Sequence, residues 1–76
     1  MNTNFSPTIR QLRAFLAVYQ LKKLSAAAQR LFVTQSAVSM LIRQLEDGLD
    51  TRLFDRTTRS LKATAAAEQM MVTVER

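Results

Sequence analysis

The chain has 76 residues, enough for one small domain whose hydrophobic core is only marginally sufficient by itself. Hydrophobic residues make up 47% of it, with one Gly and one Pro, which is typical of a folded and mostly helical protein. The net charge of +5 favours polyanionic partners, and the absence of both Cys and His excludes disulfides, the usual zinc sites and the commonest general base. We therefore predict no metal, no cofactor and no enzymatic activity.

Targeting signals are also missing from the sequence. A membrane-spanning helix needs about 20 consecutive apolar residues, and no apolar run in this sequence approaches that length. Residues 1–7 are polar with one aromatic, Phe5, and lack the basic-then-apolar order of a signal peptide. We expect a cytoplasmic protein that begins with a loose arm, in which Phe5 packs against the body of the domain.

The first predicted helix runs from about 8 to 21. Thr8 and Gln11 have the spacing of a capping box, in which each side chain satisfies a backbone N–H of the first turn. Apolar residues then recur at helical spacing, at Ile9, Leu12, Phe15, Leu16 and Tyr19.

A second, shorter helix is predicted from about 25 to 31. Ser25 is a suitable N-cap, and Leu24 just before it is placed as a hydrophobic staple. The run 26–28 is all Ala, which favours a helix and also allows a close approach to the next one. The helix is predicted whether the alanines serve only as good helix formers or also make a specific contact where the two helices cross.

The third predicted helix, 34–48, has one apolar and one polar face. Val38, Leu41, Ile42 and Leu45 share one stripe at about 100° per residue, and this stripe should face the core. Thr34 is placed to cap the helix. The other face carries small polar groups and a cation, with Gln35 at the entrance and then Ser36, Ser39, Met40 and Arg43.

The second and third predicted helices are joined by about three residues, and the third opens with small polar side chains. This pattern predicts a helix-turn-helix whose second helix enters the DNA major groove.

Beyond this helix the pattern changes to two short strands. Gly48 or Asp50 can supply the left-handed residue that ends the helix. Residues 52–54 and 60–63 then read as strands around a basic turn at 55–59, the outline of a wing. Arg56 and Arg59 at its tip would reach phosphates or a narrow minor groove, although a solvated turn with incidental charge is the alternative.

From Thr64, the next predicted N-cap, the chain turns helical again. Its apolar residues cover more than one face, which indicates pairing with another copy or continuation into a further domain. We assign Met70, Met71 and Val74 to the pairing surface.

With these residues laid out, the chain resembles the N-terminal DNA-binding domain of LysR-type transcriptional regulators. The resemblance spans about 9 to 67 and rests on the segments 12–15, 25–31, 33–39, 42–46 and 52–56, with Leu49 and Arg59. It implies a mainly α fold, a winged helix-turn-helix at 1–63 with three helices and a two-stranded wing at 55–60, followed by the start of a linker helix at 64–76. It also implies a homodimer paired through that helix at the bacterial nucleoid, and a small-molecule effector bound only by a C-terminal domain outside this chain.

The resemblance also implies a set of residues that contact double-stranded DNA. Gln35, Ser36 and Ser39 would meet base edges or nearby phosphates, with Thr34 beside them, while Ser25 and Arg43 would hold phosphates. Arg59 would enter the minor groove. Arg56 and Thr58 would lie close to it.

Several positions depart from the family pattern. Lys22 and Lys23 replace Gly-Ser, Ser36 replaces Pro, Met40 replaces a basic residue, Asp50 replaces Gly, and Ala65 and Ala67 replace Glu and Gly. Ser36 can donate a hydrogen bond where Pro cannot, so the base preference is expected to shift. Met40 removes one charged contact.

Sequence-specific DNA binding is thus the function that the sequence favours. The alternative is a small basic helical module that binds an acidic protein or a membrane surface. That alternative calls for an apolar stripe opposite the cations, whereas the third helix presents small polar groups.

Overall fold

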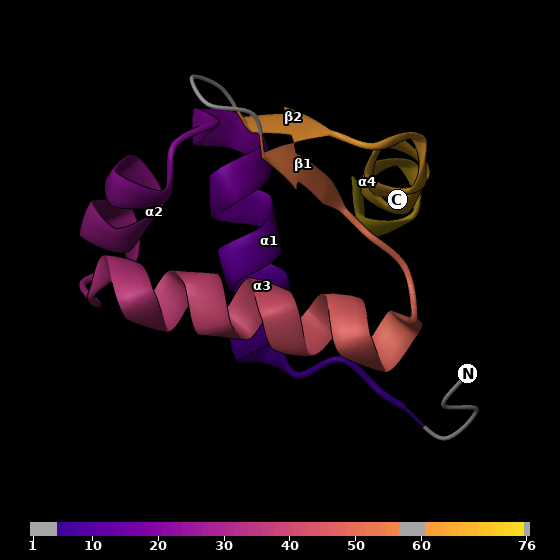
Figure 1. Ribbon diagram of the computed structural model, residues 1–76, viewed down its shortest axis with the longest axis horizontal. Coiled ribbons are helices and arrows are strands. Elements are labelled where there is room, and N and C mark those ends of the chain that lie inside the picture. The colour runs from indigo at the N-terminus through magenta and orange to yellow at the C-terminus, as the bar shows by residue number, and fades with distance from the viewer. Residues whose placement is uncertain (1–4, 57–60, 76) are drawn as a thin grey trace.

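The computed structural model describes residues 5–56 and 61–75, and these fold into helices with one small sheet (Figure 1). The elements follow in the order α1 (Ile9–Leu21), α2 (Leu24–Leu31), α3 (Gln35–Leu49), β1 (Phe54–Arg56), β2 (Leu61–Ala63) and α4 (Ala65–Glu75). In Figure 1, α3 crosses α1, β1 leads from the end of α3 toward the upper end of α1, and β2 returns beside it toward α4. None of the described helices is long and apolar enough to span a bilayer. The predicted mainly α fold is confirmed.

Three helices begin where their threonine caps predict. Thr8 Oγ1 accepts a hydrogen bond from Gln11 N at 3.0 Å, and Gln11 Oε1 accepts one from Thr8 N at 3.1 Å, which completes the capping box. The hydroxyls of Thr34 and Thr64 each accept a bond from the amide three residues later, at 3.1 and 3.2 Å. These bonds satisfy amides that a helix start leaves without an intrahelical partner.

The predicted start of α2 is wrong by one residue. Lys23 is the N-cap and Leu24 is already helical, so Ser25 does not cap this helix. The amide of Ala27 donates to Lys23 O at 3.1 Å, which extends the helical ladder toward the N-terminus. Leu24 is partly buried against the core, and this packing stabilises the earlier start.

The core lies where α1, α2 and α3 meet. The predicted stripe on α3 faces it, because Val38, Ile42 and Leu45 are at most 1% exposed. Ala27 and Ala28 are buried too, which supports the close approach of α2. The other buried hydrophobic side chains are Ala14, Phe15, Ala17, Val18, Leu53, Phe54, Ala67 and Met71.

The two strands pair in antiparallel register, with Phe54 opposite Ala63 and Arg56 opposite Leu61. The sequence predicts the first strand at 52–54, whereas β1 lies at 54–56, because the backbone of Leu53 bonds to Glu46 and Thr64. Its N–H donates to Glu46 Oε2 at 2.8 Å, and its carbonyl accepts from Thr64 N at 2.9 Å. Arg56 therefore belongs to β1 and not to the turn, and the predicted wing residues 57–60 lie outside the described residues.

The sequence offers Gly48 and Asp50 as alternatives for the left-handed residue that ends α3. Asp50 takes the left-handed conformation, with φ 53°, while Gly48 lies inside the helix. A side chain at position 48 would clash with the ring of Phe5, because the aromatic ring of the N-terminal arm packs directly on this glycine. The predicted packing of Phe5 against the body is confirmed.

Substitution of Gly48 should reveal this contact as a non-additive effect on stability. Gly48→Ala alone displaces the Phe5 ring, which offsets the gain of about 0.5–1 kcal/mol expected from replacing a helical glycine. In a Phe5→Ala background the same substitution should show that gain in full. Urea denaturation of the four proteins of the double-mutant cycle measures the coupling, and additive effects would contradict the contact.

Helix α4 turns one face inward. Ala67 and Met71 are four residues apart and are 0% and 4% exposed, so both belong to the core. The assignment of Met71 to a pairing surface is therefore wrong, since its side chain is already covered by this chain. Met70 is partly buried and Val72 is 59% exposed, while the side chain of Val74 lies outside the described part of the structure.

Candidate nucleic-acid interface

The outward face of α3 carries the polar residues that the sequence singled out. Gln35, Ser36, Met40 and Arg43 are exposed, and Ser39 is half-buried beside them. The opposite face of the same helix is fixed in the core, so the orientation of this polar face is set by packing. Thr34 is exposed at the entrance, although its hydroxyl oxygen is engaged by the helix cap.

The turn before α3 is closed by backbone hydrogen bonds. Phe32 ends α2 in the left-handed conformation, with φ 58°, and its N–H donates to Gln29 O at 3.3 Å. The next amide, that of Val33, donates to Ala28 O at 3.0 Å. This pattern satisfies carbonyls at the end of α2 and directs the chain sharply into α3.

Arg56 lies in a different place from the one predicted. It is not at the tip of a turn: from β1 its guanidinium reaches back to α3, where Nη2 donates to Ser39 Oγ at 3.3 Å. Two residues that the sequence assigned separately to the wing and to the third helix are thus in direct contact. The bond uses an acceptor site of Ser39 and leaves its hydroxyl hydrogen free to donate to a further group.

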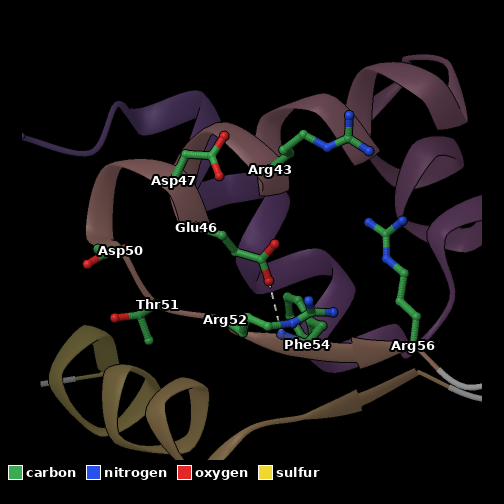
Figure 2. Close-up of a pocket in the computed structure, with 8 residues that line it drawn as sticks. All are labelled: Arg43, Glu46, Asp47, Asp50, Thr51, Arg52, Phe54 and Arg56. Carbon is green, nitrogen blue, oxygen red and sulfur yellow. Dashed lines mark hydrogen bonds between the residues drawn. The ribbon is translucent and has the colours of Figure 1, made fainter. Parts of the chain in front are cut away.

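A groove runs between α3 and the start of β1 (Figure 2). It encloses about 500 Å³, and the arginines Arg43 and Arg56 lie at one end, with Asp50 and Thr51 at the other. Its full lining is Arg43, Glu46, Asp47, Asp50, Thr51, Arg52, Phe54 and Arg56. The arginine end presents two exposed guanidinium groups from two elements, an arrangement suited to an anionic oxygen such as that of a phosphate.

Glu46 is the structural residue that sequence reasoning missed. Its place beside Asp47 near the end of a helix is typical of a solvated acid. Instead, Glu46 Oε2 accepts from the backbone amides of Leu53 and Phe54, at 2.8 and 3.2 Å; Figure 2 shows the second bond. The carboxylate therefore connects α3 to the strand that carries Arg56. The only signal in the sequence is its place seven and eight residues before those amides, which no helical or strand pattern marks.

The remaining predicted contact residues are less closely placed. Ser25 is exposed in the first turn of α2. Thr58 and Arg59 lie outside the described residues. The structure thus brings Ser39, Arg43 and Arg56 together and leaves Ser25 on a neighbouring helix.

The closed turn between α2 and α3, the polar outer face of α3 and the antiparallel pair after it define a winged helix-turn-helix domain. The sequence agrees: residues 9–68 match the family described as bacterial regulatory helix-turn-helix protein, lysR family. The chain belongs to this family.

Relatives within the family are regulators of transcription by name. The chain is 41% identical over 69 residues to the regulator YfeR of Shigella flexneri, covering 91% of this chain and 22% of that protein. It is 48% identical over 63 residues to ShiR of Corynebacterium glutamicum, covering 83% and 21%. The chain thus spans about one fifth of the length of these relatives.

Solved structures agree with the fold. The oxidized form of Corynebacterium glutamicum OxyR superimposes with a TM-score of 0.92 at 32% identity, over 97% of this chain and 23% of that one. The protein in the CbnR_DBD–DNA complex superimposes with a TM-score of 0.85 at 33% identity, over 91% of this chain and 79% of that one.

Proposed function

We propose that this chain is the sequence-specific DNA-binding part of a transcriptional regulator, with α3 as the recognition helix in the major groove. The observation that carries the proposal is the outer face of α3, where Gln35 and Ser36 are exposed and Ser39 accepts a hydrogen bond from Arg56, which lines one groove together with Arg43. Short hydroxyl and amide side chains let a helix lie close to base edges, and Gln can bond bidentately to adenine. A similar protein solved with DNA supports this proposal.

The arginine end of the groove supplies the contact to the DNA backbone. Arg43 on α3 and Arg56 on β1 hold one phosphate segment between helix and wing, and the bond from Arg56 to Ser39 fixes the strand relative to the helix. Ser25 holds a second phosphate from the start of α2. Thr58 and Arg59 complete the wing at the minor groove, as the family resemblance implies.

A basic module for an acidic protein or a membrane surface is the rival function. Membrane binding through an amphipathic helix needs an apolar face turned outward, whereas the apolar stripe of α3 is buried in the core. Binding of the chain to anionic lipid vesicles without any binding to duplex DNA would favour the rival.

The test is DNA binding by fluorescence anisotropy across a salt series, on a random duplex and on a duplex selected from a random pool. Each phosphate neutralised contributes about 0.9 to the slope of log affinity against log salt. Arg43→Gln and Arg56→Gln should each lower the slope by about 0.9 and weaken binding to both duplexes alike.

The matched control is Arg13→Gln, which removes the same charge from an exposed residue lining a different hollow, beside Leu31 and Leu41. Its salt slope should equal that of the unmodified chain. A slope near zero for the unmodified chain, or equal losses in all three variants, would contradict a phosphate site in this groove.

The wider assembly belongs to the same proposal. Residues 1–63 form the DNA-binding domain, and the helix from 64 both closes the core and carries the pairing surface of a homodimer, at Met70 and Val74. The regulator acts in the cytoplasm, at the bacterial nucleoid, and an effector binds a further domain. Sedimentation at the concentrations of the binding assay measures the pairing.

A further inference from the structure

Met40 is the exposed large hydrophobic side chain of α3. Its exposed fraction is 61%, whereas Val38, Ile42 and Leu45 of the same helix are at most 1% exposed, and Leu41 is partly buried against the core. The core therefore does not hold this side chain. An apolar group of this size gains free energy if a partner covers it.

The position of Met40 on the helix identifies the partner. At about 100° per residue, Ser36 and Arg43 lie about 40° and about 60° from Met40 on one side of the helix axis, and the exposed Gln44 lies about 40° away on the other side. Met40 thus lies on the outer face of α3, directly beside a short hydroxyl and a guanidinium of the arginine groove, at the margin of the polar residues that the proposed function turns toward DNA. A duplex that contacts both Ser36 and Arg43 therefore lies within reach of the Met40 side chain.

The chemistry of the side chain restricts what it can contact there. A thioether has no donor and is only a weak acceptor, so it cannot neutralise a phosphate or compete for the polar base edges. The apolar group that the major groove offers is the C5-methyl of thymine. Methionine is unbranched and flexible, which lets it adapt to a methyl group between polar neighbours.

We infer that Met40 reads thymine by covering its C5-methyl group in the major groove, so that binding depends on that methyl at one position of each half-site. The inference rests on the proposed function, because it requires α3 to lie in the major groove. It assigns a base preference to a position where the sequence indicated only the loss of a charged contact.

The experiment replaces, one at a time, each thymine of the selected duplex with deoxyuridine. This change removes the methyl group and keeps the hydrogen-bonding edge of the base. Burial of one methyl group corresponds to about 0.8 kcal/mol, or about fourfold in affinity. The affinity of the unmodified chain, measured by fluorescence anisotropy at fixed salt, should fall about fourfold when one particular thymine of each half-site is replaced.

The variants decide whether Met40 is responsible. Met40→Ala and Met40→Gln should bind the thymine and uracil duplexes alike at that position, while Met40→Leu should keep most of the difference. Ser36→Ala, on the same face, should keep the whole difference. A merely structural role for Met40 would weaken both duplexes equally and would not move this ratio.

Two results would overturn the inference. One is that the affinity of the unmodified chain stays the same whichever thymine is replaced with deoxyuridine. The other is a Met40→Ala variant that keeps the full penalty of the unmodified chain. If no sequence is enriched at all, the proposed function fails and the inference with it, whereas an enriched duplex without a methyl effect overturns the inference alone.

Discussion

Replacing Phe15 with alanine should lower the free energy of unfolding by about 3–5 kcal/mol, the cost typical of removing a buried aromatic side chain. Phe15 is 0% exposed, and its ring lies 5.7 Å from that of Phe54 and 6.0 Å from that of Tyr19, between centroids. It therefore joins α1 to the first strand. At about 0.05–0.15 kcal/mol per residue, a domain of 76 residues has only about 4–11 kcal/mol in total.

Urea denaturation followed by far-UV circular dichroism measures the loss. Ile9→Ala is the matched control, because Ile9 belongs to the same helix but is 69% exposed. Its stability should stay within about 0.5 kcal/mol of the unmodified chain. Equal denaturation midpoints for Phe15→Ala and Ile9→Ala would contradict the central place of Phe15 in the core.

Glu46→Ala should have the second largest effect, with a loss of about 2–3 kcal/mol in stability. The carboxylate accepts hydrogen bonds from two backbone amides, and each hydrogen bond to a charged acceptor contributes about 1.5–3 kcal/mol. In the variant, water can bond to the two amides and recovers part of this free energy. The strand would also lose the connection that holds Arg56 next to Ser39. DNA affinity should therefore fall, even though the variant carries one negative charge fewer.

Asp47→Ala separates the hydrogen bonds from the charge. Asp47 is exposed, and in the described part of the chain its carboxylate has no hydrogen-bond partner. Its removal should leave stability within about 0.5 kcal/mol and slightly raise DNA affinity at low salt. Amide hydrogen exchange at Leu53 and Phe54 should quicken only in Glu46→Ala. The connecting role of Glu46 would be refuted by identical stability and exchange in the two variants.

The pairing surface predicted on α4 shows how local patterns can mislead. The sequence assigns Met70, Met71 and Val74 to one surface because the apolar residues of this helix cover more than one face. The fold decides which face is inside: Met71 follows Ala67 by four residues and enters the core, whereas Val72 remains exposed. A helical pattern states that residues share a face and does not state which neighbour covers it.

The sequence by itself determined the helices, their threonine caps and the composition of the outer face of α3. The reason is that capping bonds span three residues and apolar spacing repeats within a turn, so both are readable locally. The strand pattern also indicated the wing, although it placed Arg56 at the tip instead of in β1, and the family resemblance added the set of candidate DNA contacts.

Only the tertiary structure decided the contacts that shape the site. Arg56 bonds to Ser39 across 17 residues, Phe5 packs on Gly48, and Leu24 begins α2 early by joining the core. Each of these depends on the close approach of segments that are distant in the chain. Helix propensity and residue spacing do not predict such contacts, because the geometry of the contacts follows from how the helices pack on one another.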